Sequence, residues 1–266
     1  MKKLVPFFGI GIAVYSVVSF LFLFTHTPPI TTNNNFGIID DTCHSSSFPT
    51  KPEVPLFIKW ENFLQKTRDL YFIQIGANVG KNVGSGDPIW EYVRPCHWNG
   101  AVIEPNPATY AKLKGNYHDL EDINRVVTLN LGVSHSPGYA TVKGHGETAS
   151  LGVIRKVKES DNVVEVVSLA QLWNRLKSHI PSTGVDILVI DAEGNEAKIL
   201  CKGGELPHPK PSRILFEIAH LSLEVKDEID ETLRSQGYRQ SADLIHRDDY
   251  ALRHNLPAQD RLYELI

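Results

Sequence analysis

Short apolar runs recur along most of the chain and are separated by longer amphipathic stretches. Such runs, bounded by turn-forming residues, are typical of buried strands. They predict strands at residues Tyr71–Ile75, 101–103, 126–133, Val163–Val167, 185–190 and 213–218. The run at 101–103 is apolar throughout, and the run at 185–190 is interrupted only by Asp186. Both are therefore expected in the centre of a parallel sheet, where strands are buried on both faces.

Helix signals lie between these strands. Asn106 followed by Pro107 places a capping residue before a residue favoured in the first turn, which predicts the start of a helix. Ser168 with Gln171 three residues later forms a capping box at the start of a second helix. A third helix is expected over residues 222–236, where Gly237 ends it.

Two weaker extended runs, at residues 242–246 and 261–266, end the chain. Strands that alternate with helices predict a parallel sheet with helices on both faces. The expected fold class is therefore α/β: a doubly wound, mostly parallel sheet with an antiparallel C-terminal edge.

The first predicted strand ends in a small loop that contains Gly76, Asn78 and Gly80. An apolar strand that stops in glycines is how a doubly wound sheet presents a nucleotide or related cofactor to its carboxyl edge. A P-loop would need Gly-Lys-Ser/Thr at its end, and a dinucleotide site would need a glycine where Asn78 stands. S-adenosylmethionine carries no phosphate, so it suits a glycine loop that lacks the residues needed to bind phosphates.

Carboxylates lie at or near the ends of three of the predicted strands. Glu104 comes after the strand that follows the glycine loop, where a carboxylate can accept both ribose hydroxyls of a nucleoside; the alternative is a solvated strand end. Asp191 and Glu193 follow the strand at 185–190, where one can act as a general base while the other orients the acceptor or a metal. Their alternatives are a helix cap and a favourable first-turn charge, and two carboxylates are too few to predict a metal site. Glu217 lies near another strand end on the same edge.

Several motifs resemble, in the same order, those of the FkbM family of S-adenosylmethionine-dependent methyltransferases: FIQIGANVG, AVIEPNPATYAKLKGNY, LNLGVS, VVSLAQLW and DILVIDAEGNEAKIL. The resemblance covers residues 71–217 and implies the class I methyltransferase, Rossmann-like fold. For the cofactor, it implies that the methionine-side loop consists of Gly76, Ala77, Asn78 and Gly80, and that Glu104 holds the ribose with Asn106 close by. The adenine would lie near the end of the third strand, at Gly132, Val133 and Ser134. The resemblance also implies that Asp191 and Glu193 face the transferred methyl group and the acceptor. Gln74 stands where many members carry an acidic residue, so it supplies no charge to the cofactor ammonium.

The N-terminal residues differ from the rest of the chain. Residues 4–24 carry no charge and follow Lys2 and Lys3, and their length of about 30 Å as a helix is enough to cross a bilayer. No Lys or Arg follows until Lys51, so the positive-inside tendency predicts a retained signal anchor with a cytosolic N-terminus. A cleaved signal peptide and a buried core helix are the alternatives. The expected organisation is a cytosolic tip and transmembrane anchor at residues 1–24, a flexible stem at 25–55 and one methyltransferase domain at 56–266.

The net charge narrows the class of partner. A formal net charge of -4 argues against a general polyanion binder, so no nucleic-acid partner is expected. The expected function is methyl transfer from S-adenosylmethionine to a hydroxyl oxygen of a small molecule or glycan. It would be performed by a single-pass membrane protein whose domain is luminal or extracytoplasmic. Two alternatives stay open: a non-catalytic binding or scaffold protein on the same fold, and a membrane-anchored glycosyltransferase that uses a nucleotide sugar.

Overall fold

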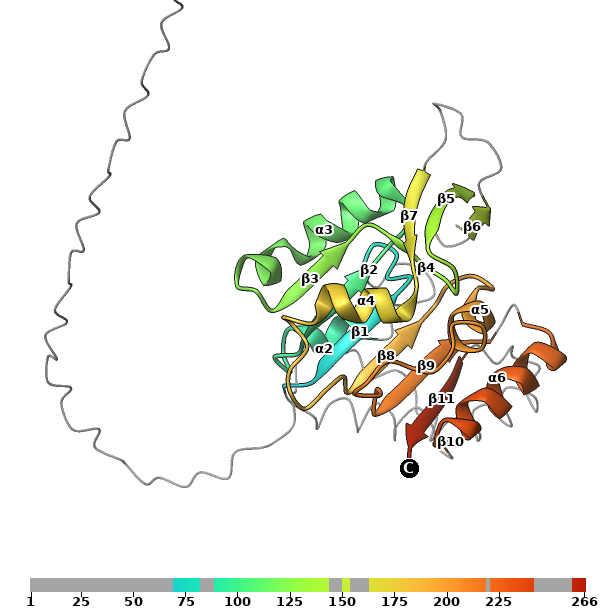
Figure 1. Ribbon diagram of the computed structural model, residues 1–266. Coiled ribbons are helices and arrows are strands. Elements are labelled where there is room, and N and C mark those ends of the chain that lie inside the picture. Colours follow the sequence, from blue (N-terminus) through green and yellow to red (C-terminus); the bar gives the residue numbers. More distant parts are fainter. Residues whose placement is uncertain (1–68, 82–88, 144–149, 154–162, 219–220, 242–259) are drawn as a thin grey trace, which may run out of the picture. The chain divides into compact units, whose positions relative to one another are not determined.

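The computed structural model describes residues 69–81, 89–143, 150–153, 163–218, 221–241 and 260–266 (Figure 1). All of them fall within one compact unit of the chain. Of the three cysteines in the sequence, Cys96 is buried, Cys201 is partly buried, and Cys43 lies outside the described residues.

Among the described residues, seven strands form the main sheet, in the order β10-β11-β9-β8-β1-β2-β3. Their bounds are Tyr238–Gln240 (β10), Asp260–Leu265 (β11), Arg213–Glu217 (β9), Ile187–Ile190 (β8), Tyr71–Ile75 (β1), Asn99–Ile103 (β2) and Val126–Leu129 (β3). Strands β9, β8, β1, β2 and β3 pair in parallel, and β11 runs antiparallel to both of its neighbours. The strand order reverses at β1, between β2 and β8, which is where an open α/β sheet binds its ligand. The predicted doubly wound, mostly parallel sheet is confirmed.

The antiparallel strand is not the edge strand that the sequence predicted. Strand β11 lies between β9 and β10, with Phe216 opposite Arg261 and Tyr238 opposite Leu265. The last residues of the chain therefore insert next to β9, and the edge is taken by an earlier segment. The extended run expected at 242–246 lies outside the described residues, and the strand that precedes it is at Tyr238–Gln240.

Side-chain alternation along the strands divides the core into two layers. Ile73 and Ile75 of β1 pack on the face covered by α4 (Leu169–Leu176), α5 (Glu196–Leu200) and α6 (Leu223–Ser235). Phe72 packs on the opposite face, where α2 (Trp90–Val93) and α3 (Pro107–Asp122) lie (Figure 1). Because successive side chains of a strand point to opposite faces, one apolar strand supplies both layers. Helices on both faces leave the ends of the parallel strands as the place for loops.

Three of the described helices begin with a capping side chain, and the two caps predicted at Asn106 and Ser168 are confirmed. Asn106 caps α3, because its Oδ1 accepts hydrogen bonds from the backbone N–H groups of Ala108 (3.0 Å) and Thr109 (3.3 Å). Ser168 and Gln171 form the predicted capping box of α4. The side chain of Ser222 accepts from the backbone of α6 in the same manner.

A second, smaller sheet has the strand order β4-β7-β5-β6. It consists of Gly132–Val133 (β4), Val163–Val167 (β7), Gly138–Lys143 (β5) and Ser150–Val153 (β6). The single strand expected over 126–133 is thus wrong: β3 ends at Leu129, and β4 pairs with Val166 and Val167 of β7 instead of continuing along β2. Asn130 makes the break, since its Nδ2 donates to the carbonyl oxygens of Glu104 (2.8 Å) and Pro105 (3.1 Å).

No helix of the described part of the chain is long and apolar enough to cross a membrane. The longest of these, α3, has 16 residues and includes Lys112 and Lys114, whereas a membrane span needs about 20 mostly apolar residues. This finding contradicts the expectation of a preceding transmembrane helix, and with it that of a single-pass protein with a luminal or extracytoplasmic domain. Residues 4–24 and the predicted stem at 25–55 lie outside the described residues.

Candidate functional site

The loop after β1 is built by backbone contacts to two neighbouring strands. The N–H groups of Gly76 and Ala77 both donate to the carbonyl oxygen of Ile103, at 2.9 Å each, and this holds the loop against the end of β2. Gly76 has φ +79°, and a β-carbon at this position would lie 1.7 Å from the carbonyl oxygen of Asp191. Glycine is therefore required for both conformation and space. The contact brings the glycine loop and Asp191 together.

Glu104 holds the two loops on either side of it. Its Oε2 accepts a hydrogen bond from the backbone N–H of Asn78 (3.1 Å), and its Oε1 accepts one from the N–H of Asn106 (2.8 Å). The side chain is buried, and this burial raises its pKa to about 7, with a smaller contribution from the charge of Asp191 and an opposing one from the two backbone hydrogen bonds. Each carboxylate oxygen keeps a further lone pair, so Glu104 can still accept two hydroxyl groups.

Gly80 closes the glycine loop against helix α3. Its N–H donates to the carbonyl oxygen of Ala77 at 2.8 Å, and its φ is +59°. A β-carbon there would lie 2.4 Å from Cδ1 of Leu113 and 2.5 Å from Cε2 of Tyr117. Asn116, also on α3, donates to the carbonyl oxygen of Val79 at 2.8 Å. Gly80 thus allows the loop to pack closely on α3, in the conformation in which the N–H of Asn78 donates to Glu104.

The predicted adenine-side residues lie in the second sheet. Gly132 and Val133 form β4, and the N–H of Ser134 donates to the carbonyl oxygen of Val167 at 3.0 Å. In the described part of the chain, the backbone hydrogen bonds of this segment run to β7 and not to the glycine loop. The expectation that Gly132, Val133 and Ser134 lie at the end of the third strand is wrong, because β3 ends at Leu129 and Gly132 and Val133 form the separate strand β4. Their part in cofactor binding stays a prediction.

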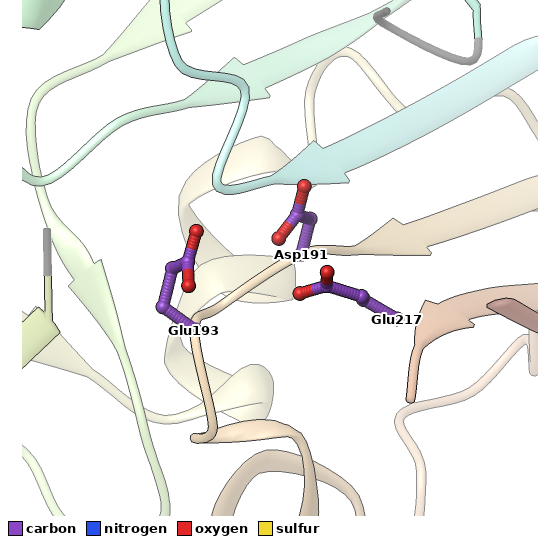
Figure 2. A group of neighbouring side chains, drawn as sticks. All are labelled: Asp191, Glu193 and Glu217. Atoms are coloured by element: carbon purple, nitrogen blue, oxygen red, sulfur yellow. The ribbon is translucent and has the colours of Figure 1, made fainter. Parts of the chain in front are cut away.

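Three carboxylates converge at the carboxyl ends of β8 and β9 (Figure 2). Asp191 follows β8 directly, Glu193 lies in the turn after it, and Glu217 is the last residue of β9. One oxygen from each side chain lies within 4.8 Å of the others. Strands β8 and β9 are parallel neighbours with Ile190 opposite Phe216, so the next residue of each strand reaches the same place. Parallel pairing therefore places Glu217 beside the predicted pair, which makes this cluster larger than the sequence indicated.

The turn that carries this cluster has a specific backbone conformation. Glu193 has φ +49° and Gly194 has φ +88°, a pair of left-handed residues that reverses the chain after Asp191. The side chain of the buried Glu196 accepts a hydrogen bond from the N–H of Ala192 at 2.8 Å, and this bond stabilises the turn. Helix α5 begins only at Glu196. Asp191 and Glu193 therefore neither cap this helix nor lie in its first turn, and these two alternatives are excluded.

Glu217 has the most perturbed environment of the three acids. Its pKa is raised to about 8, first by partial burial, then by the charge of Asp191 and a hydrogen bond shared with Asp191, and least by the charges of Glu193 and Glu196. Two like charges this close disfavour full ionisation of the group. Such a cluster can share protons, accept a proton from a hydroxyl group, or hold a divalent cation through oxygen ligands.

Two acids were missed or undervalued by the sequence reading. Glu217 was noted near a strand end but not placed in the reaction site, and a systematic search for acids one residue past each apolar strand would have included it. Glu196 was not singled out, although an acidic residue in the first turn of a helix is a recognised signal. Gln74, in the middle of the sheet between Val102 and Val189, is buried.

The sheet order, with an antiparallel strand inserted second from the edge, defines a class I methyltransferase-like α/β fold. The family model of the "Methyltransferase FkbM domain" matches residues 74–240, which is more than half of the chain. The chain belongs to the FkbM methyltransferase family. No curated protein matches it.

Solved structures similar to this chain include other methyltransferases. A precorrin-6y C5,15-methyltransferase from Geobacter metallireducens is 14% identical with a TM-score of 0.37, over 76% of this chain and 79% of that one. A putative rRNA methylase from Clostridium thermocellum is 12% identical with a TM-score of 0.42, over 81% and 98%. Fibrillarin from Aeropyrum pernix, solved with bound S-adenosyl-L-methionine, is 11% identical with a TM-score of 0.38, over 75% and 67%. These values are too low to carry an argument, so the assignment rests on the family match.

Proposed function

We propose that this protein transfers a methyl group from S-adenosylmethionine to a hydroxyl oxygen of a small molecule or glycan. The observation that carries the proposal is the pairing of two features at one sheet edge. One is the buried Glu104, whose oxygens are held toward the glycine loop. The other is the cluster of Asp191, Glu193 and Glu217, which a contact between Gly76 and the Asp191 backbone holds beside that loop.

The residues present fit an adenosyl cofactor. Glu104 is a buried carboxylate that has accepting capacity left on both oxygens, which is what two neighbouring ribose hydroxyls require. The loop of Gly76, Ala77, Asn78 and Gly80 would contact the amino-acid end, with Asn106 beside the ribose and Gly132, Val133 and Ser134 toward the base. S-adenosylmethionine supplies, when bound, an activated methyl group and a good leaving group, so the protein has mainly to orient the acceptor and take up a proton.

The acid cluster favours a hydroxyl acceptor. Carboxylates accept hydrogen bonds from hydroxyl groups and can remove their protons. Three of them within 4.8 Å create a negative region that repels a phosphate or carboxylate on the acceptor. The net charge of -4 likewise disfavours a nucleic-acid acceptor. Asp191, which is exposed, is the member of the cluster that a substrate can reach.

Calorimetry of the full chain tests the cofactor. We expect S-adenosylmethionine and S-adenosylhomocysteine to bind in a one-to-one ratio and UDP-sugars, with or without Mn²⁺, to give no heat. Absence of binding by both adenosyl ligands would contradict the proposal, and binding of UDP-sugars alone would favour a glycosyltransferase. Incubation with a panel of neutral glycans and alcohols, followed by location of the 14-dalton mass increase, then tests the acceptor. Cofactor binding without transfer to any of them would favour a non-catalytic binding protein.

A further inference from the structure

Asp191 and Glu217 face each other across two adjacent parallel strands. Each follows one residue after a register pair, Ile190 opposite Phe216, and Figure 2 shows their carboxyl groups turned toward one another between the ends of β8 and β9. The two differ in exposure, since Asp191 is exposed and Glu217 is partly buried. Burial disfavours the charged form of a carboxyl group. Within this pair, a proton is therefore held more readily by Glu217 than by Asp191.

Two further acids besides Asp191 raise the pKa of Glu217. The turn after β8 contributes Glu193, and α5 contributes the buried Glu196. Arg261 on β11 directs its Nη1 to Asp230 on α6 at 2.7 Å. This concentration of acids makes full ionisation of the cluster unfavourable and favours retention of a proton.

We propose that Asp191 and Glu217 hold one proton between them, with the proton on Glu217 and the ionised oxygen on Asp191. Asp191 is then the catalytic base, and Glu217 is a positioning residue that acts through it. This inference rests on the proposed methyl transfer. The hydroxyl proton of the acceptor passes to a carboxylate oxygen of Asp191, the acceptor oxygen keeps the electron pair for its bond to the methyl carbon, and the carbon–sulfur electron pair leaves with the sulfur.

The shared proton has a structural consequence. A protonated Glu217 donates a hydrogen bond to Asp191 and so fixes the orientation of the base, whereas two ionised carboxylates would repel each other. The raised pKa of Glu217, about 8, agrees with a proton that is retained at neutral pH. Glutamine at this position keeps an N–H donor, so it should still donate a hydrogen bond to Asp191, as the protonated glutamic acid does. Alanine has no such donor and should not orient Asp191.

The first test is a pH titration of the full chain with carbon-13 in the glutamate carboxyl groups. We expect one Glu resonance to titrate near pH 8 in addition to that of Glu104. Glu217→Gln should remove this resonance, Asp191→Asn should lower its midpoint by at least one pH unit, and the matched control Glu231→Gln, on the exposed side of α6, should leave it unchanged. Titration of every carboxyl group other than Glu104 below about pH 6 would overturn the inference, whether or not the variants fold.

The second test compares a cationic ligand with a neutral one. S-adenosylmethionine carries a sulfonium charge that S-adenosylhomocysteine lacks, so loss of the shared proton strengthens binding of the former alone. We expect the affinity ratio of the two ligands to rise about threefold between pH 7 and pH 9 in the wild type, on the scale of a screened interaction between unit charges. The ratio should be independent of pH in Glu217→Gln.

The outcomes separate this inference from the proposed function. If neither adenosyl ligand binds, the proposed function fails, while the carboxyl titration still decides whether the pair shares a proton. If both ligands bind with an affinity ratio that does not change with pH, the proposed cofactor stands and the shared proton is refuted. Saturable binding of Mg²⁺ that disappears in both Asp191→Asn and Glu217→Gln would also refute it, because the carboxylates would then be ionised ligands of a cation.

Discussion

The backbone of Gly76 packs directly against the carbonyl group of Asp191, so that a β-carbon at residue 76 would lie 1.7 Å from the carbonyl oxygen. This contact joins the loop after β1 to the turn after β8, and these two strands are adjacent in the sheet. The contact therefore keeps the predicted cofactor loop next to the predicted catalytic acid, although the two are more than a hundred residues apart in sequence. Several testable consequences come from this arrangement and from the buried Glu104.

Gly76→Ala should strongly destabilise the domain. The new methyl group would meet the Asp191 carbonyl, and alanine is disfavoured at φ +79°. We expect the free energy of unfolding, measured by urea denaturation, to fall by at least ~2 kcal/mol. The matched control is Gly115→Ala in the interior of α3, where a β-carbon meets no atom within 4 Å. That substitution should raise stability by about 0.5–1 kcal/mol. Equal effects of the two substitutions would contradict the close packing described for Gly76.

Glu104→Gln should change how stability depends on pH. The folded-state pKa of Glu104 is raised from 4.5 to about 7, so the folded state binds this proton more tightly than the unfolded state does. Its stabilising contribution is therefore complete below pH 4.5 and is lost as the pH rises through 7. Relative to the wild type, the variant should gain up to about 3 kcal/mol between pH 4.5 and pH 8. Urea denaturation at both pH values measures this gain, and a difference that is constant with pH would show that Glu104 is not perturbed.

The same carboxylate should matter for cofactor affinity. Glu104→Ala removes the proposed acceptor of two ribose hydrogen bonds, and it removes the carboxylate that accepts from the N–H groups of Asn78 and Asn106. Hydrogen bonds to a charged group contribute about 1.5–3 kcal/mol each, so calorimetry with S-adenosylhomocysteine should show at least a tenfold weaker affinity. Asp191→Asn serves as the control and should bind this neutral ligand as the wild type does. A parallel loss in both variants would mean that the two acids do not have separate roles.

Asn106→Ala should weaken helix α3. The side chain of Asn106 accepts hydrogen bonds from Ala108 and Thr109 at the helix start. Loss of such a cap typically costs about 1 kcal/mol. Asn106→Ser should retain most of this stability, because serine is also a good capping residue. Thermal denaturation of the two variants and the wild type measures the difference, and an alanine variant as stable as the serine variant would contradict the capping role.

The features that could be predicted from the sequence are those that depend on residues close together in the chain. Continuous apolar runs identified β1, β8 and β9 because a central strand must be apolar on both faces. The caps at Asn106 and Ser168 were predicted because a capping side chain bonds the backbone two or three residues later. The positions of Glu104 and Asp191 followed from the rule that parallel strands carry their ligands at their carboxyl ends.

Pairing partners could not be predicted in this way. The apolar pattern of residues 126–133 is the same whether they form one strand or two, and the hydrogen bonds of Asn130 to residues 104 and 105 decide where β3 ends. Likewise, an extended run near the C-terminus does not reveal whether it takes the edge or inserts beside β9. Strand neighbours depend on contacts between distant parts of the chain, which leave no local periodicity.

The sequence by itself determined the class of fold, the family and the identity of the acids at the sheet edge. Only the tertiary structure showed that Glu217 lies beside Asp191 and Glu193, with one oxygen of each within 4.8 Å. The reason is that the register between β8 and β9 places residues 191 and 217 together, and partial burial together with like charges then perturbs Glu217. A side chain's ionisation depends on its neighbours in space, and these neighbours are chosen by strand pairing and packing.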